Sequence, residues 1–186
     1  MSSPIHLQMM PEVTHLLQTL ADIATESDLP VLLIGGHAVT ALGCPRSTFD
    51  IDLLIPRQSA PDWEAVLAKL QYRTFHRSEQ FLQMEGTDEL PLPPIDFMLV
   101  DEEVFEQLHE SRFSAQPLAT PGVLPLIALK LHAIRQPTRD NIEKDWQDIF
   151  SLIRAHGLTL DNSDLRAIVL RHGGERAIER IQTELG

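Results

Sequence analysis

The segment Val31–Ile55, VLLIGGHAVTALGCPRSTFDIDLLI, decides the fold of this 186-residue chain. Short apolar runs predict buried strands, and glycines and prolines mark the turns between them. The pattern therefore predicts four features in succession: a strand at Val31–Ile34, a turn at Gly35-Gly36, a short helix at His37–Leu42 and a strand at Phe49–Ile55. Two aspartates lie in the second of these strands, and they carry the first indication of chemistry.

Asp50 and Asp52 are two residues apart, so in a strand they project from the same face, about 7 Å apart. Neighbouring carboxylates repel each other unless a cation lies between them, and carboxylate oxygens suit Mg²⁺ or Mn²⁺. Asp96, near the start of the apolar strand Ile95–Val100, is a third candidate because aspartate is disfavoured in strands. If the two strands are neighbours, the three acids form a metal site for phosphoryl or nucleotidyl transfer. The alternative is that the acids are exposed at strand ends and pair with arginines.

Gly35 and Gly36 occupy a strand-to-helix turn. Glycine allows a close approach of the backbone, and the following helix offers free N–H groups to a phosphate. The simpler interpretation is a tight turn with no ligand. The phosphate interpretation gains weight because thirteen residues, 37–49, separate the glycines from the Asp50-x-Asp52 pair.

The rest of the chain divides into two parts. Residues 1–116 have an α/β character, whereas residues 117–186 read as consecutive helices after a loop with three prolines. We therefore predict an α+β protein in which an α/β core precedes a helical C-terminal region. The remaining predicted helices are Pro11–Ser27, Ala60–Leu70, Glu102–Glu110, Leu124–Arg135, Asp140–His156, Ser163–His172 and Glu175–Leu185, and the remaining predicted strands are Tyr72–His76 and Phe81–Glu85.

The net charge of −12 disfavours a general nucleic-acid-binding protein, because such proteins are usually basic. A local basic patch that binds an RNA end is still consistent with the sequence, because four arginines lie in one part of the chain: Arg46, Arg57, Arg73 and Arg77. The lone cysteine, Cys44, fits a reducing compartment. No leader peptide or membrane span is recognisable, and we expect a cytoplasmic protein with no membrane partner.

The layout Gly35-Gly36, thirteen residues, Asp50-Ile51-Asp52 resembles the signature of the DNA polymerase β-like nucleotidyltransferase superfamily. The local sequence GGHAVTALG…RSTFDIDLLI is most similar to the minimal AbiEii toxin-like nucleotidyltransferases. A weaker similarity continues through LIALKLHAIRQPTRDNIEKDWQDIFSLI in the helical part. The resemblance implies a mixed β-sheet with flanking helices, NTP binding, and Mg²⁺-dependent transfer of a nucleoside monophosphate to a hydroxyl acceptor.

The resemblance also implies roles for individual residues. Asp50, Asp52 and Asp96 would be catalytic residues and ligands of Mg²⁺ or Mn²⁺. The implied nucleotide-binding residues are Gly35, Gly36, His37, Arg46, Thr48, Lys130 and Lys144. His37 departs from the superfamily pattern, in which Ser or Thr often follows the glycines, so it either donates to a phosphate or crowds the pocket. Lys130 either enters the site or lies on the helix surface. For Lys144 with Asp148 the spacing favours an ordinary ion pair along a helix, unless both side chains turn toward Asp50.

Two acceptors remain open: an RNA end, as in a toxin that has an antitoxin partner, and a small molecule such as an aminoglycoside. The negative charge favours a cationic small molecule. Enzymes of that kind usually have a larger acceptor-binding domain, however, and on this ground we expect the toxin-like function. The alternative from another class is a non-catalytic module that binds a nucleotide or a partner protein on the same fold.

Overall fold

The computed structural model describes residues 5–90, 92–137 and 141–186, with side chains from residue 13 onward. The described elements follow in chain order: α1 (Ile5–Glu26), β1 (Leu32–Leu33), α2 (Gly35–Ala41), β2 (Ile51–Pro56), the 3₁₀ turn η1 (Arg57–Ser59), α3 (Ala60–Lys69), β3 (Tyr72–Arg77), β4 (Phe81–Gly86), β5 (Ile95–Val100), α4 (Glu102–Glu110), β6 (Arg112–Phe113), β7 (Thr120–Pro121), α5 (Val123–Ile134), α6 (Ile142–Ala155), α7 (Ser163–Gly173) and α8 (Glu175–Leu185). The predicted α+β class is confirmed.

The main sheet has five strands in the order β1-β2-β5-β4-β3. β2 and β5 run parallel, whereas the other neighbouring pairs are antiparallel, so the sheet is mixed, as the resemblance implied. The long connection between β2 and β5 contains α3 and the β3–β4 hairpin, which is the kind of crossover that a parallel pair requires. This order makes β2 and β5, the strands of Asp52 and Asp96, direct neighbours.

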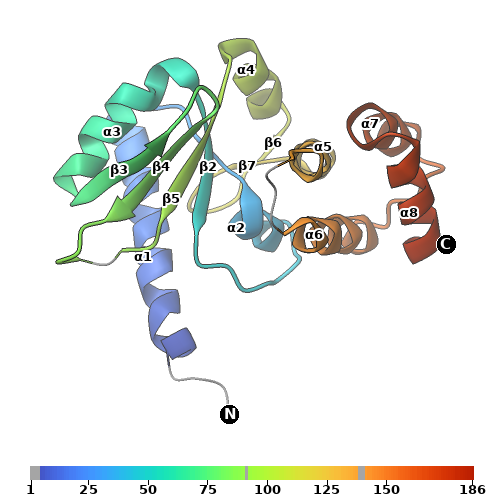
Figure 1. The fold of residues 1–186 in the computed structure, drawn as a ribbon, viewed down its shortest axis with the longest axis horizontal. Helices are drawn as coiled ribbons and strands as arrows, with labels where there is room; N and C mark the ends of the chain where they lie inside the picture. The colour runs from blue at the N-terminus through green and yellow to red at the C-terminus, as the bar shows by residue number, and fades with distance from the viewer. Residues whose placement is uncertain (1–4, 91, 138–140) are drawn as a thin grey trace.

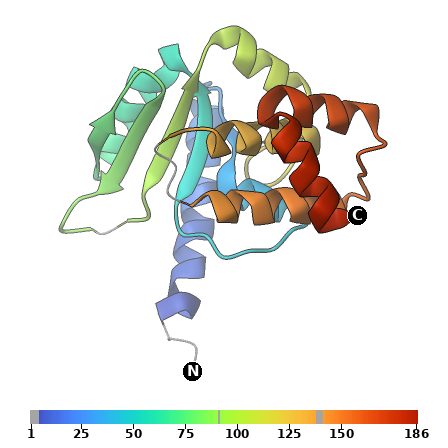
Figure 2. The ribbon, with the colours of Figure 1, turned by 45° about the vertical axis from the view of Figure 1, so that its right-hand side comes forward.

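The two faces of the sheet are covered differently (Figure 1). Alternate residues of β2 and β5, such as Ile51, Leu53 and Phe97, are fully buried in the main core with side chains of α1 and α3. On the opposite face, Leu54 is buried with Leu32 and with Phe105 of α4. The C-terminal helices α5 to α8 lie to one side of the sheet (Figure 2). The period of two in these strands therefore separates a core face from a face that carries the polar site.

Several predicted boundaries differ from the structure. The first helix begins at Ile5 rather than at Pro11. β2 begins at Ile51 and not at Phe49, because Ile51 already bonds to the Pro94 carbonyl and the β2–β5 pairing starts with Ile51 and Ile95. Asp50 is consequently an exposed residue just before the strand. The predicted start of the sixth helix, at residue 140, lies outside the described residues.

The predicted division between residues 116 and 117 falls inside a small second sheet. β6 and β7 pair across it, with Arg112 opposite Pro121, and the Leu33 N–H donates to the Ala119 carbonyl. The main core cluster also contains residues of both parts, among them Leu33 and Ile149. The division stays a prediction about sequence character. Among the described residues, no helix is both long and apolar enough to cross a membrane.

Candidate active site

A row of polar side chains crosses the sheet at one level. Asp52 of β2 is the register partner of Asp96 on β5, and Asp96 in turn lies opposite Gln83 on β4. Gln83 lies opposite His76 on β3. Register partners on neighbouring strands share a face of the sheet. The row Asp52–Asp96–Gln83–His76 therefore points to the same side, and all four residues line one cavity of about 700 Å³.

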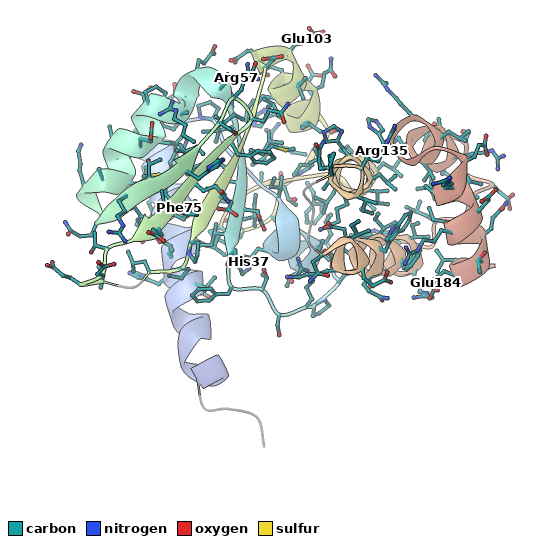
Figure 3. All side chains as sticks on the ribbon, in the orientation of Figure 1. His37, Arg57, Phe75, Glu103, Arg135 and Glu184 are labelled. Carbon is teal, nitrogen blue, oxygen red and sulfur yellow. The ribbon has the colours of Figure 1, made fainter. Side chains whose placement is uncertain are left out.

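His76 joins this row because β3 is irregular. Thr74 lies opposite Met84, but it is His76, not Phe75, that lies opposite the next residue, Gln83. The extra residue makes a β-bulge, a feature that often redirects a side chain near a functional site. Phe75 is half exposed as a result, near the outer edge of the sheet in Figure 3. The sequence alone did not indicate His76 or Gln83, because neither the bulge nor the strand pairing has a signal in the local pattern.

Asp96 is oriented by its neighbour on β4. The amide nitrogen of Gln83 donates to Oδ1 of Asp96 at 3.0 Å, in a partly buried environment. A hydrogen bond to a carboxylate favours its charged form and restricts its rotation. Asp96 is thus held toward the cavity, beside Asp52, as a site for a cation requires.

Gly35 lies against Asp52. Its φ of +62° belongs to the left-handed region, and a Cβ at this position would overlap the Asp52 carboxylate. Gly36 has a different neighbour, because a Cβ there would lie 2.5 Å from Nη2 of Arg46 and 2.8 Å from the Cβ of Thr48. The side chains of Asp52 and Arg46 occupy the space beside the two glycines. The glycines therefore allow close packing of site residues, in addition to the phosphate contact that we predicted for them.

Lys130 enters the cavity instead of lying on the helix surface. It projects from α5, is buried, and its Nζ lies 3.1 Å from Oδ1 of Asp145 and 2.6 Å from Oδ2 of Asp148, both on α6. Arg46 adds a second cation to this group, since its Nε lies 3.0 Å from Oδ1 of Asp148. Two of these contacts are ion pairs by distance but lack the alignment of a hydrogen bond: Arg46 Nε with Asp148 Oδ1, and Lys130 Nζ with Asp148 Oδ2. Two cations and two carboxylates thus balance each other, and Lys130 and Asp145 of this group line the cavity.

Lys144 does not take part in that group. It is exposed on α6, and its backbone N–H donates to the N-cap side chain of Asn141. Asp148, four residues later, pairs with Arg46 and Lys130. The ordinary ion pair that we considered for Lys144 and Asp148 is therefore replaced by contacts from other elements, which no spacing along one helix could reveal.

His37 is half buried at the first turn of α2, near one end of β2, whereas Arg57 lies beyond the other end of that strand (Figure 3). Nε2 of His37 is buried and has no hydrogen-bond partner among the described residues. Burial and the nearby Arg46 guanidinium lower the pKa of His37, and the Asp50 carboxylate opposes this shift. At neutral pH the imidazole is therefore uncharged, with Asp50 and Arg46 as its electrostatic neighbours.

The structure thus separates the predicted residues into two groups. Gly35, Asp52, Asp96 and Lys130 line the cavity. The others lie outside its lining: Asp50, Gly36, His37, Arg46, Thr48 and Lys144. Within the described parts of the chain, no three His, Cys, Asp or Glu side chains are placed to hold a metal ion together. The pair Asp52 and Asp96 still fits Mg²⁺, which is commonly bound by one or two carboxylates together with substrate phosphates and water.

The four arginines that could have formed a basic patch are each paired with an acid. Arg57 contacts Glu79 and Asp101, and Arg73 contacts Glu85 and Asp88. Arg77 pairs with Glu64, and Arg46 with Asp148. Because the carboxylates offset these charges, the arginines do not create a positive groove beside the cavity. The cavity wall itself includes four acids: Asp52, Asp96, Asp101 and Asp145.

Comparison with solved structures identifies the class of fold. The antibiotic-resistance factor ANT(2'')-Ia aligns over 94% of this chain and 100% of its own length, with a TM-score of 0.65 and 17% identity. A nucleotidyltransferase-like protein from Paracoccidioides brasiliensis aligns over 94% of this chain and 92% of its own, with a TM-score of 0.57 and 15% identity. The lincosamide antibiotic adenylyltransferase LnuA aligns over 77% and 95%, with a TM-score of 0.55 and 15% identity.

The chain therefore has the nucleotidyltransferase fold. At these identities the likeness concerns the fold alone. No protein-family profile matches the sequence. No curated protein is similar to it in sequence either.

Proposed function

We propose that this protein is a metal-dependent nucleotidyltransferase that moves a nucleoside monophosphate from an NTP to a hydroxyl acceptor. The observation that carries the proposal is the pairing of Asp52 with Asp96 on adjacent parallel strands, at the wall of a cavity large enough for a nucleotide. The shared fold supports the same reaction class. The closeness to AbiEii-type toxins stays a prediction from the sequence.

In this proposal Asp52 and Asp96 hold the cation, and Asp50, two residues upstream, adds a ligand when its exposed side chain turns inward. Bound Mg²⁺ or Mn²⁺ would neutralise phosphate charge and lower the pKa of the attacking hydroxyl. Asp96, oriented by Gln83, accepts the proton of that hydroxyl while the hydroxyl oxygen bonds to the α-phosphorus and the bond to the β-phosphate breaks, so that pyrophosphate leaves. Lys130 lies at the same wall, and in this proposal its ammonium group contacts the phosphates of the nucleotide.

For the acceptor we propose a small molecule rather than an RNA end. A polyanion needs unpaired positive charge near the catalytic acids, whereas the nearby arginines are paired and the four acids of the wall outnumber its two cations, Arg57 and Lys130. The wall also has an apolar part, which includes Met98, Leu126 and Leu129 and suits a ligand with a carbon skeleton.

The length of the chain does not argue against a small acceptor. ANT(2'')-Ia, whose crystal structure contains adenylyl-2''-tobramycin, aligns over 98% of its length with 87% of this chain. A protein of comparable length therefore accommodates both a nucleotide and an aminoglycoside. An antitoxin partner and a cytoplasmic location remain predictions.

Label transfer from α-labelled NTPs tests this function. The purified protein is incubated with Mg²⁺ or Mn²⁺, each NTP, and acceptors that include tobramycin, lincomycin and transfer RNA. We expect label on a small molecule, its loss in Asp52→Asn and Asp96→Asn, and its retention in the matched control Asp161→Asn, at an exposed loop position. Label on RNA would select the other acceptor, and nucleotide binding without transfer to any acceptor would favour the non-catalytic module.

A further inference from the structure

A second cavity, of about 510 Å³, lies among the C-terminal helices. It is lined by Leu131 of α5, by Arg135 just after the end of α5, by Trp146 of α6 and by residues of the α7–α8 junction. The main cavity is bordered by different residues of the same helix α5, namely Lys130, His132 and Ala133. The second cavity is therefore a separate hollow, next to the helix that carries Lys130.

Three arginines line this second cavity: Arg135, Arg176 and Arg180. Arg176 and Arg180 are four residues apart on α8, where like charges repel each other. Arg135, the C-cap of α5, lies on the side toward α7 in Figure 3, and its Nη1 donates to the His172 carbonyl at 3.5 Å. No acid lines the cavity among the described residues. Glu143 pairs with Arg180, which leaves the charges of Arg135 and Arg176 to attract an anion.

The arginines differ in how they are engaged. Arg180 lies 4.6 Å from the centre of the Trp146 ring and forms a two-pronged ion pair with Glu143, at 2.9 Å and 2.6 Å. That hydrogen bond lowers the pKa of Glu143. Arg135 and Arg176 are exposed and form no ion pair with a described acid. Arg180 is thus held against the Trp146 ring, while Arg135 and Arg176 remain available to a ligand.

The local backbone and the local field support an anion at this position. The N-cap of α8, Gly174, lines the cavity and provides no side chain to cap the helix, so the positive end of the α8 dipole lies at this junction without a carboxylate or hydroxyl cap. A Cβ at Gly174 would meet no atom within 4 Å, which shows that the space beside it is open. Burial and then the charges of Arg171, His132 and Arg135 lower the pKa of the neighbouring His172.

We propose that this cavity is a second binding site, which takes a small molecule bearing a multivalent oxyanion. The oxyanion would contact the guanidinium groups of Arg135 and Arg176 and the start of α8, and the remainder of the ligand would lie in the cavity beside these groups. A guanidinium group matches the geometry of both phosphate and carboxylate, so the ligand class includes phosphorylated molecules and polycarboxylates. This site is independent of the proposed nucleotidyl transfer.

Titrations with inorganic pyrophosphate and with citrate test the proposal. Binding is measured by tryptophan fluorescence and by calorimetry. Trp146 lies at the cavity, whereas Trp63 is fully buried against Phe97 on the far side of the sheet and serves as a constant background. We expect saturable binding of at least one probe, with the two arms showing whether phosphate or carboxylate is preferred. Asp52→Asn should leave this binding unchanged, because Asp52 belongs to the other cavity.

Charge removal at the two exposed arginines provides the specific test. Arg135→Gln with Arg176→Gln should raise the Kd at least about tenfold, since each charge-assisted contact contributes on the order of a tenfold change. The matched control is Arg166→Gln, an exposed position of α7 outside the cavity, which should keep the wild-type Kd. Failure of both probes to bind saturably, or equal Kd values in the double variant and the control, would overturn the proposal.

Discussion

The carboxylate of Asp52 occupies the space that any side chain on residue 35 would need. This contact joins the Gly-Gly turn to the Asp-x-Asp strand, two features that the sequence separates by thirteen residues. Glycine is favoured at residue 35 for two reasons. A side chain there would overlap Asp52, and the backbone φ of +62° belongs to the left-handed region. The turn and the acid are therefore one structural unit.

Gly35→Ala should consequently destabilise the protein and displace Asp52. We expect a loss of more than about 2 kcal/mol in the free energy of unfolding, because the left-handed backbone alone costs about 1–2 kcal/mol. Urea denaturation measures this loss. Gly43→Ala is a matched control, since Gly43 also has a positive φ, of +87°, but an added Cβ would meet no atom within 4 Å. Equal losses for the two variants would show that the contact with Asp52 has no energetic weight.

The buried ion group of Lys130 predicts a large effect from a single substitution. Lys130→Met should destabilise the protein by about 3–5 kcal/mol, because it leaves Asp145 and Asp148 buried with less positive charge beside them. The exposed pair Arg154 and Glu184 provides a comparison, and Arg154→Gln should cost less than about 1 kcal/mol. Denaturation curves of the two variants at the same pH measure the difference, and a near-neutral Lys130→Met would contradict this assignment.

The depressed pKa of His37 predicts a pH dependence of stability. Because the folded state binds the proton less readily than the unfolded state, unfolding takes up a proton below the ordinary pKa of about 6.5. The contribution of His37 to stability is therefore fully present above that pH and decreases as the pH falls toward the lowered pKa. His37→Asn should flatten this part of the profile relative to wild type, as measured by denaturation between about pH 5 and pH 8. His172 shifts in the same direction, so His172→Gln is measured in parallel to separate the two contributions.

The elements that the sequence predicts well are those with a strong local pattern. The apolar run IDFMLV predicts a strand, and it forms β5. The helical spacing of Trp63 and Leu67 predicts a buried helix face, and both residues are buried in α3. Asp52 and Asp96 could be selected for the same local reason, since an acid inside an apolar strand is conspicuous. The pairing of their strands was an expectation that the β2–β5 register confirms.

The residues that sequence reasoning missed depend on contacts between distant segments. Gln83 reaches Asp96 only because β4 pairs with β5, and His76 reaches the cavity only through a bulge in β3. The ion group of Arg46, Lys130 and Asp148 combines a loop with two helices, so the pairing of Asp148 could not be read from its own helix. Asp50 was placed in a strand because its neighbours are apolar, whereas the pairing of β2 with β5 begins one residue later.

The central claim is that Asp52 and Asp96 together hold one divalent cation beside a nucleotide. The most direct measurement is a crystal structure of the protein soaked with Mn²⁺ and a non-hydrolysable ATP analogue, with the anomalous signal of manganese as the marker. The account predicts a manganese peak within about 2.5 Å of carboxylate oxygens of both residues and of a phosphate oxygen, and no such peak in Asp96→Asn crystals. A nucleotide bound in the cavity with manganese away from both aspartates would contradict it.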